Sequence, residues 1–520
     1  MDCWARARSG MLPPADRLSV RSSGELMSLS TRVLALVVLT LAAPACKKAE
    51  TTAPSGKKGL TVEEADKQRA LAREKAKANT LVGLANEDLS KGRWFSARER
   101  AKRALEAEPN DADAFAVLGA ANWRAGDFEA STKAFKEALE IDPKNFGAAV
   151  GLGRNYQAVG DHKAAIELQD TLLAADPKQF DPLVTKLWSQ YALADATNAV
   201  KTLDALFANM ETDNALRPLL LAYAAFVRPL EGKGELIKIE GAKGTSDLQV
   251  DASQGIKHAG GLVGTEFTRV VFFELREEAR IHKPLADQLK LKEVGKITPI
   301  GATAETSVVL IPEIKFGDLK LSNIPAIVDD LTPYAVGDVP GVVLGRQVMN
   351  KIGAITFDFP NASLELQAAA PTAPPAGSAE APLLLIDMHI LLVPATTMSI
   401  DGSDFKFYAW LGGSYGASLA IARKEFLKSG HLPRELEQLD DPTNGLKMVL
   451  LEKVKIGETP VEGGVGGLVL ANTPPDAGLG QIVEGSSFEL GGYINFPLLK
   501  TMKITYALSQ GKVYLAPRGK

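Results

Sequence analysis

The sequence of 520 residues has few of the residue types on which common enzyme chemistries and disulfide frameworks depend. It contains two cysteines, which cannot staple a small fold. Its five histidines show no ligand-like spacing, so we predict that the chain builds no zinc site and uses no cofactor. These histidines are His162, His258, His282, His389 and His431.

An excess of basic residues is also absent. The formal net charge is −4 and the pI is about 5.9, so we expect no nucleic-acid partner. Hydrophobic residues make up 46% and charged residues 23% of the chain, which excludes a wholly disordered chain and a polytopic membrane protein. At roughly 100–200 residues per domain, the length predicts about three or four domains.

No apolar run near the start is long enough for a membrane span, but one run is typical of an export signal. Residues 1–24 are rich in Arg and Ser, and we expect translation to start at Met27, with Met11 as the alternative. A short polar region then precedes the apolar run 33–43 and a few small residues. This order is that of a secretory signal, whereas a membrane span needs about 20 residues.

Cys46 lies where cleavage of that signal is expected. The segment Ala43-Pro44-Ala45-Cys46 resembles a bacterial lipobox, in which the cysteine is acylated and becomes the first residue of the mature protein. It departs from the family by an Ala in place of Leu at the first position. The resemblance implies a lipoprotein anchored to a membrane of the bacterial cell envelope, with residues 47–58 as a flexible tether. The alternative is an ordinary signal peptide with an incidental cysteine.

A period of 34 residues runs through the next part of the chain. It separates three prolines and three glycines, namely Pro109, Pro143, Pro177, Gly92, Gly126 and Gly160. The pattern resembles the tetratricopeptide repeat, a pair of antiparallel helices whose copies stack because one pair cannot bury its apolar face alone. We predict this solenoid over residues 78–228, with a degenerate fourth unit at 180–206 and a capping helix near 214–227.

In the tetratricopeptide family, the first helix of each pair lines a concave face that binds peptides. Carried over to this chain, the face presents Asn86, Trp123, Arg124, Arg154 and Gln157. A cationic groove with a tryptophan suits an acidic or extended peptide. The regular Lys/Asn pattern of clamps for C-terminal carboxylates is missing. The alternative is that the tryptophan packs between repeats and the arginines are solvated.

After Pro229 the pattern changes to short apolar runs rich in β-branched residues, which predicts strands and turns. An Ala/Pro-rich linker, residues 367–382, divides this region into halves that resemble each other. The segment 314–318 is echoed 140 residues later by 454–458. We also match Gly345 with Gly492, 355–359 with 502–506, and 272–274 with 409–411.

Each half resembles a lobe of a retropepsin-like aspartic peptidase. In the first half, residues 340–345, 355–359 and 364–366 resemble the closing segment of that family. In the second half, residues 407–418 and 421–423 resemble the strand, turn and helix that normally carry its catalytic motif. The resemblance implies two mainly-β lobes that pair about a pseudo-twofold axis, with a peptide-binding cleft between them.

The catalytic motif of that family is missing from both halves. The family has Asp-Thr/Ser-Gly in each lobe, and the two carboxylates share one proton and act as acid and base. Neither motif occurs in the chain. Our alignment puts Glu274 and Leu411 at the two positions, and a lone carboxylate cannot form the pair. We therefore predict a pseudo-enzyme with no catalytic residue.

The sequence thus predicts a multidomain exported protein, an all-α tetratricopeptide solenoid followed by two mainly-β retropepsin-like lobes. The predicted parts are a leader (1–46), a tether with a leader helix (47–77), the solenoid (78–228), a first lobe (231–366), a linker (367–382) and a second lobe (383–518). We expect a non-catalytic scaffold that is held at a membrane by its lipid and binds a protein or peptide on the concave face or in the cleft. Two alternatives stay open: an active aspartic endopeptidase with an atypical acid pair, and a purely structural envelope spacer.

Overall fold

The computed structural model describes residues 62–250, 255–273, 275–299, 302–387, 392–413, 417–431, 446–461, 463–470, 488 and 490–517. The predicted leader with Cys46, most of the tether, and Glu274 lie outside these residues. Within the described part of the chain, no helix is long and apolar enough to cross a membrane.

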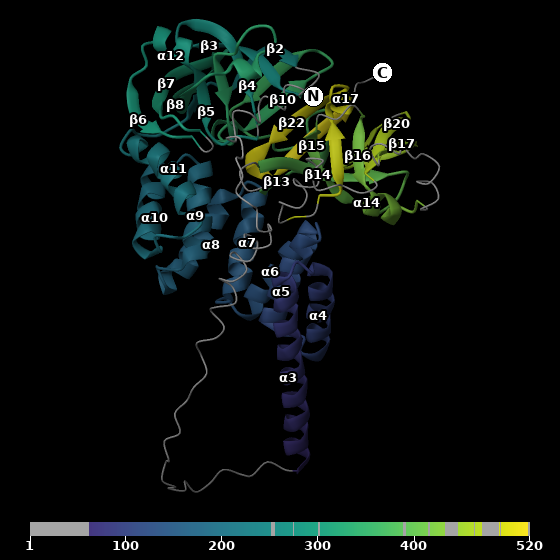
Figure 1. The fold of residues 1–520 in the computed structure, drawn as a ribbon. Helices are drawn as coiled ribbons and strands as arrows, with labels where there is room; N and C mark the ends of the chain where they lie inside the picture. Colours follow the sequence, from purple (N-terminus) through teal and green to yellow (C-terminus); the bar gives the residue numbers. More distant parts are fainter. Residues whose placement is uncertain are drawn as a thin grey trace, which may run out of the picture.

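Antiparallel helix pairs build the first part of the described chain, as predicted. The helices are α3 (Val62–Ser90), α4 (Trp94–Ala107), α5 (Ala112–Arg124), α6 (Phe128–Ile141), α7 (Phe146–Ala158), α8 (His162–Ala175), α9 (Phe180–Ala192), α10 (Ala196–Asn209) and α11 (Arg217–Val227). They form the solenoid that hangs below the β region in Figure 1. The degenerate fourth pair, α9 and α10, and the final helix α11 are confirmed.

The turn inside each helix pair has a left-handed residue at the same position of the repeat. Gly92, Gly126 and Gly160 have φ values of 71°, 76° and 76°, a conformation that glycine adopts without steric cost. In the degenerate fourth pair, Ala194 has this conformation with φ 55°. The aspartates that follow the last three turns cap the next helix through their side chains. The 34-residue period therefore records local turn and capping requirements.

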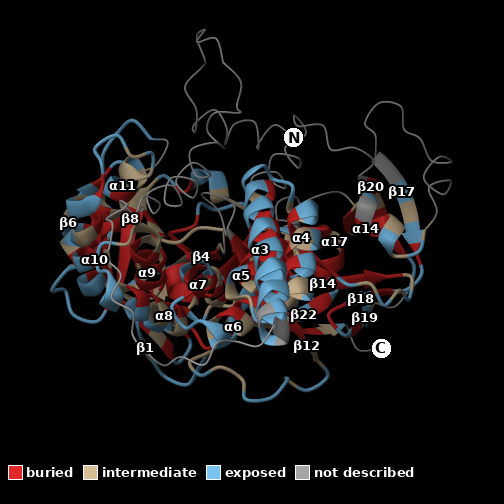
Figure 2. Ribbon diagram, turned by 90° about the horizontal axis from the view of Figure 1, so that it is seen from below, coloured by how far each residue is buried: buried red, intermediate tan, exposed pale blue. Residues whose placement is uncertain are grey.

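The first helix, α3, is longer than the sequence analysis predicted. The predicted boundary between leader helix and solenoid, at residues 77 and 78, falls inside α3. The helix runs through because residues 62–82 contain neither Gly nor Pro, and ion pairs such as Asp66–Arg69 and Glu74–Lys77 line its exposed surface. Figure 1 shows its N-terminal half projecting beyond α4, and Figure 2 shows the helix mainly exposed.

Strands and short helices build the rest of the described chain. Those of the first lobe are β1 (Lys238–Glu240), β2 (Lys243–Val250), β3 (Lys257–Val263), β4 (Glu266–Phe272), β5 (Ala279–His282), α12 (Lys283–Gln288), β6 (Glu293–Ile297), β7 (Thr306–Phe316), β8 (Leu319–Asp329), β9 (Val342–Leu344), α13 (Arg346–Met349), β10 (Ala354–Asp358) and β11 (Ser363–Gln367). Those of the second lobe are β12 (Ala379–Pro382), β13 (Leu384–Asp387), β14 (Leu392–Ile400), β15 (Phe407–Gly413), β16 (Leu419–Ala422), α14 (Arg423–Lys428), β17 (Leu446–Leu451), β18 (Val454–Ile456), β19 (Thr459–Val461), β20 (Val465–Leu470), β21 (Gly492–Asn495), α17 (Phe496–Leu499), β22 (Met502–Ala507) and β23 (Lys512–Pro517).

The two lobes repeat one strand order, so the predicted internal duplication is confirmed at the level of strand pairing. In the first lobe the order is β4–β9–β5–β8–β7, and in the second it is β15–β21–β16–β20–β17. The successive pairs are parallel, antiparallel, parallel and antiparallel in both lobes. The turn of 314–318 and its echo at 454–458 also agree, because Gly317 and Gly457 have φ values of 59° and 57°.

A shared sheet joins the lobes about a local twofold axis. Its order is β2–β11–β10–β22–β23–β12, and β10 pairs with β22 in antiparallel fashion. Thr356 lies opposite Thr505, and their side-chain oxygens form a buried hydrogen bond of 2.9 Å. One residue to either side, Ile355 pairs with Tyr506 and Phe357 pairs with Ile504. The ITF and ITY segments are thus related by an axis through the threonine pair.

Three details of the predicted lobe alignment are wrong. The axis through Thr356 and Thr505 matches residues 355–357 with 504–506, so the predicted match of 355–359 with 502–506 is two residues out of register. The parallel pairing of each central strand puts Leu411 at the position of Phe272, so Leu411 is not the counterpart of Glu274. The same register puts Asn495, rather than Gly492, at the position of Gly345. The predicted alignment matched similar residue types, whereas hydrogen bonding between strands and the alternation of buried side chains set the strand register.

The predicted linker 367–382 is only partly a connection. Its last four residues form β12, which pairs with β23 at the edge of the shared sheet. The buried side chains of the last helix pair, the first lobe and the second lobe meet in one continuous core, with Leu203, Phe272 and Ile494 as examples. The solenoid is therefore packed onto the lobes rather than tethered to them.

Candidate binding surfaces at the solenoid and lobe junction

The turn that follows β4 in the first lobe is held by the backbone of the segment around Gly345. The backbone N–H of Arg346 donates to the carbonyl oxygen of Arg276 at 2.7 Å, and that of Gln347 donates to Glu277 at 3.0 Å. A Cβ on Gly345 would lie 2.4 Å from the carbonyl oxygens of Glu277 and Glu278. Glycine is required here because the turn passes too close for a side chain.

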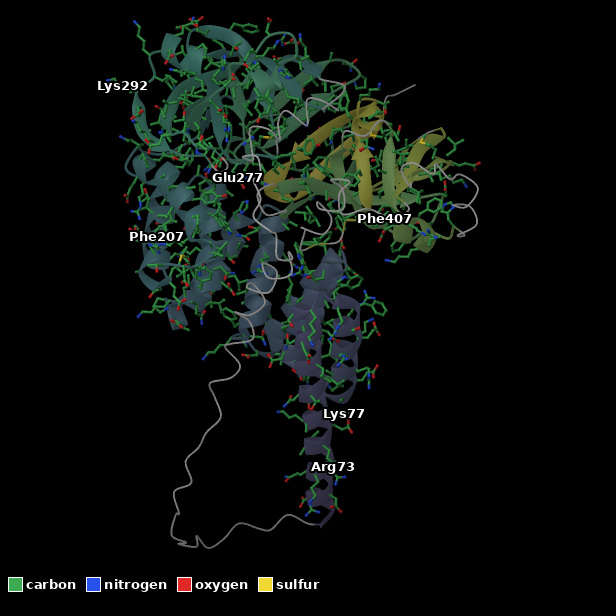
Figure 3. All side chains as sticks on the ribbon, viewed as in Figure 1. Arg73, Lys77, Phe207, Glu277, Lys292 and Phe407 are labelled. Atoms are coloured by element: carbon green, nitrogen blue, oxygen red, sulfur yellow. The ribbon has the colours of Figure 1, made fainter. Side chains whose placement is uncertain are left out.

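The carboxylates of this turn make structural contacts. Glu277 forms an ion pair with Arg346, whose side chain is almost completely buried. Figure 3 shows Glu277 where the first lobe meets the solenoid. Glu278 accepts a hydrogen bond from the Tyr191 hydroxyl of α9. Glu277 and Glu278 therefore bind the turn to α13 and to the solenoid.

The equivalent turn of the second lobe has no carboxylate. Residues 412–418 read GGSYGAS and contain neither Asp nor Glu. Asn495 holds the end of this turn, since its backbone N–H donates to Ser418 at 2.9 Å and its side-chain amide to Ala417 at 2.9 Å. Leu411 lies in β15 with none of its surface exposed. No alignment of this turn supplies a second carboxylate from the second lobe.

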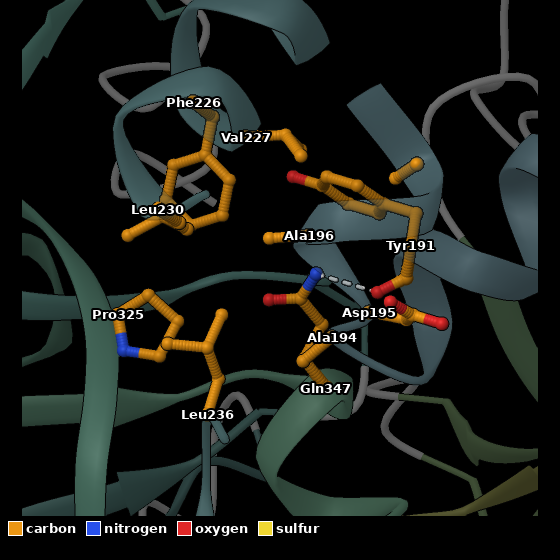
Figure 4. Close-up of a pocket in the computed structure, with 11 residues that line it drawn as sticks. Tyr191, Ala194, Asp195, Ala196, Phe226, Val227, Leu230, Leu236, Pro325 and Gln347 are labelled. Atoms are coloured by element: carbon orange, nitrogen blue, oxygen red, sulfur yellow. Dashed lines mark hydrogen bonds between the residues drawn. The ribbon is translucent and has the colours of Figure 1, made fainter. Parts of the chain in front are cut away.

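The solenoid contacts the first lobe through the helix turns of its third and fourth pairs. Gln347 of α13 donates from its side-chain amide to the backbone oxygen of Tyr191 at 2.7 Å, as Figure 4 shows. Burial and the neighbouring Glu278 carboxylate raise the pKa of Tyr191, so its hydroxyl stays a proton donor. His162, the first residue of α8, is buried, and neither ring nitrogen has a hydrogen-bond partner among the described residues. Burial, with Arg346 nearby, lowers the pKa of His162 to about 4.

The solenoid contacts the second lobe through its second pair. The ring centroids of Trp123 and Phe488 are 4.9 Å apart in an edge-to-face contact, and Phe128 packs beside them. The Tyr408 hydroxyl donates to Glu129 Oε1 at 2.7 Å. Leu275, from the turn after β4, packs against the same cluster. The turn of the first lobe thus lies among side chains of the solenoid and the second lobe.

A cavity between the fourth helix pair and the first lobe is too small for a ligand. Its lining includes Tyr191, Phe226, Pro325 and Gln347 (Figure 4). Its volume is about 10 Å³. A cavity of roughly 10–15 Å³ holds at most a single water molecule. Among the described residues, no group of His, Cys, Asp or Glu could hold a metal ion either.

The structure separates the predicted concave-face residues into two groups. Trp123 packs against the second lobe, and Gln157 donates to the Thr185 oxygen at 2.7 Å and to Ser189 Oγ at 2.8 Å, which links two repeats. Asn86, Arg124 and Arg154 are exposed. Partial burial of the guanidinium group and the nearby Arg154 lower the pKa of Arg124. Peptide binding by these residues stays a prediction.

Sequence reasoning missed the residues by which the solenoid packs on the lobes. Tyr191, Glu278, Arg346 and Phe488 are the main examples. The 34-residue period contained part of the signal, because Trp123, Gln157 and Tyr191 occupy the same repeat position. A polar or aromatic side chain repeated at the end of the first helix indicates a common surface. The partners on the lobes lie far away in the sequence and leave no such pattern.

Comparison with known proteins identifies the helical part. The tetratricopeptide repeat family matches residues 122–191. The helical part of the chain therefore contains tetratricopeptide repeats. No curated protein matches the chain.

Several solved structures are similar to parts of the chain. An O-GlcNAc transferase of Thermobaculum terrenum is 19% identical, with 26% of this chain and 27% of that chain covered and a TM-score of 0.25. The chain therefore spans about a quarter of that protein's length. A thermophilic tetratricopeptide protein of Thermus thermophilus is 18% identical, with 30% and 84% covered and a TM-score of 0.26. The first tetratricopeptide domain of Spaghetti (RPAP3), bound to an HSP90 peptide, is 18% identical, with 23% and 95% covered and a TM-score of 0.22.

Proposed function

We propose that the chain is a non-catalytic protein-binding scaffold, in which the tetratricopeptide solenoid is packed on two degenerate retropepsin-like lobes. The observation that carries the proposal is what the carboxylates do in the turns that follow β4 and β15. In the first lobe, Glu277 and Glu278 are engaged by Arg346 and Tyr191, and in the second lobe the turn has no carboxylate. An aspartic peptidase needs two carboxylates that share a proton, and the turn of the second lobe offers none.

The retropepsin-like origin of the lobes is supported by their pairing. A single chain supplies two copies of one strand order, and the copies meet about the Thr356–Thr505 pair. In each copy, the central strand leads into a turn, a short strand and a short helix. This is the arrangement that the sequence resemblance implies for a peptidase built from two lobes. Loss of the acid pair from such a frame leaves a scaffold.

The partner that we propose for the concave face is an acidic peptide or protein segment. Arg124 and Arg154 are exposed, and the nearby charge of Arg154 helps to lower the pKa of Arg124. No ion pair joins either arginine to a carboxylate among the described residues. Two neighbouring cations that no acidic side chain neutralises attract a carboxylate-bearing ligand.

Binding of a labelled peptide tests this proposal. The probe is a short fluorescein-labelled peptide of alternating Asp, Glu and Leu, titrated with the full chain and followed by fluorescence anisotropy. We expect the double variant Arg124→Ala/Arg154→Ala to bind about tenfold more weakly. Lys133→Ala/Lys136→Ala removes the same charge from α6, the second helix of the repeat that contains Arg124, and is the matched control. Equal affinity of the arginine variant and the unmodified chain would contradict the proposal.

We also propose that the chain is exported and held at a membrane of the bacterial cell envelope by a lipid on Cys46. The support is the lipobox-like segment 43–46, preceded by an apolar run and followed by a polar tether. Mass spectrometry of the mature N-terminus measures the acyl chains directly. Cys46→Ser should move the protein from the membrane fraction to the soluble fraction. An unmodified N-terminus would overturn this part.

A further inference from the structure

One edge of the solenoid forms a row of equivalent contacts, which we call the docking edge. Phe128, His162 and Ala196 are spaced by 34 residues and begin the second helix of the second, third and fourth pairs. Phe128 packs in the cluster that contains Phe488 of the second lobe. His162 is buried beside Arg346 of the first lobe, and Ala196 lines the cavity shared with Pro325. Three successive repeats thus pack against the lobes through the same repeat position.

The docking edge continues into the first repeat. The equivalent residue there is Trp94, followed by Phe95 at the position of Glu129, which accepts the hydrogen bond from Tyr408. Trp94 is half-buried, whereas Phe95 is 59% exposed. The two rings lie 6.1 Å apart in an edge-to-face contact. The first repeat therefore presents an exposed aromatic surface at the position that its neighbours use for packing.

One basic side chain contacts this aromatic surface. The Arg98 guanidinium lies 5.3 Å from the centroid of the Phe95 ring. Helix α4 has four basic residues, Arg98, Arg100, Lys102 and Arg103, against two acidic ones, Glu99 and Glu106. Arg98 and Lys102 share Glu99 as an ion-pair partner, and Arg100 pairs with Asp88 of α3, so the basic residues outnumber the carboxylates that they pair with. Arginine beside an exposed aromatic ring is typical of the residues that dominate protein–protein binding energy. The local charge favours an acidic partner.

We infer that Trp94, Phe95 and Arg98 form a second binding surface, which takes an acidic protein segment carrying an apolar anchor residue. This inference rests on the proposed scaffold function and names a surface outside the concave face. Continuity with the docking edge argues for a protein occupant, because the same position binds protein in each of the next three repeats. A partner held here would lie next to the lobes, along the row that they already occupy.

The test uses the acidic Asp, Glu and Leu peptide described above, with the full chain, two variants of the proposed surface and one control variant. We expect Phe95→Ala to weaken peptide binding about tenfold and Arg98→Glu to weaken it at least as much. Phe146→Ala is the control, because Phe146 is also an exposed aromatic at a helix start, 40% exposed, but lies at the opposite end of its repeat. Phe95 is exposed, so its replacement should leave the folding unchanged, and circular dichroism checks this.

Five outcomes separate this inference from the broader function. Weaker binding by Phe95→Ala and by the Arg124/Arg154 variant supports both surfaces. Weaker binding by the arginine variant alone overturns the inference and leaves the scaffold function standing, and no binding by any chain overturns both. Phe95-dependent sedimentation with phosphatidylglycerol vesicles, without peptide binding, would overturn it in favour of a membrane surface. Phe95-dependent dimerisation in sedimentation velocity would overturn it in favour of a second copy.

Discussion

The two lobes share a strand order, yet they hold the turn after the central strand in different ways. In the first lobe, Gly345 lets the turn pass against the backbone, and Arg346 holds Glu277 in a buried ion pair. In the second lobe, Asn495 bonds the turn through its side chain, and Phe496 takes the place of Arg346. The two copies thus keep the same strand order, while the residues that hold each turn differ with the surface that packs against it. The charged turn is the one that contacts Tyr191 of the solenoid.

Substitution at the two matched positions, Gly345 and Asn495, should give the largest difference in stability between the lobes. Gly345→Ala puts a Cβ 2.4 Å from two backbone oxygens, so the turn or α13 must move. We expect a loss of about 4 kcal/mol or more in the free energy of unfolding, measured by urea denaturation. Asn495→Ala removes one hydrogen bond and should cost about 1 kcal/mol. Similar losses for the two variants would show that the turns are held in the same way.

Removal of the ion pair should have the next largest effect. Arg346→Met leaves the Glu277 carboxylate without its cation in a partly buried site, and we expect a loss of about 3 kcal/mol in urea denaturation. The matched change in the second lobe, Phe496→Met, replaces one buried apolar side chain by another and should cost about 1 kcal/mol. A loss for Arg346→Met no larger than that for Phe496→Met would mean that the pair contributes nothing to holding the turn.

The contact between His162 and the first lobe predicts a pH dependence. Burial lowers the pKa of His162 to about 4, against about 6.5 in an unfolded chain. The unfolded chain therefore binds the proton more strongly, and the folded chain loses stability as the pH falls from about 6.5 to about 4. The full effect is about 3 kcal/mol, and it is absent above pH of about 6.5. Unfolding free energies of the unmodified chain and of His162→Gln should converge or cross over this range, and parallel curves would contradict the prediction.

The threonine pair on the local axis should give the smallest effect and the most symmetric one. Thr356→Val and Thr505→Val each leave one buried hydroxyl without its partner. We expect equal losses of about 1 kcal/mol, and a double variant that costs less than the sum. Thermal unfolding of the three variants measures this coupling. Unequal single losses that simply add would show that the axis is not a symmetric contact.

The sequence predicts what depends on neighbouring residues. The glycines and aspartates of the helix turns, such as Gly126 and Asp127, recur because each turn needs them locally. Strand positions in the lobes were predicted from the apolar patterns, but the register between the strands was not. Matching Gly345 with Gly492 aligns identical residues, whereas the observed strand pairing matches Gly345 with Asn495. The packing of Trp123 on Phe488 joins residues far apart in the chain, and no local pattern records it.

An assay of peptide-bond cleavage tests directly whether the two lobes form an active aspartic peptidase. The purified full chain and its Glu274→Ala variant would be incubated with an unstructured protein from about pH 3 to about pH 7, the range in which a carboxylate pair would share a proton. We expect no cleavage by either protein, because the turn of the second lobe supplies no carboxylate. Cleavage by the unmodified chain that is lost in Glu274→Ala would contradict the account and make Glu274 part of an acid pair.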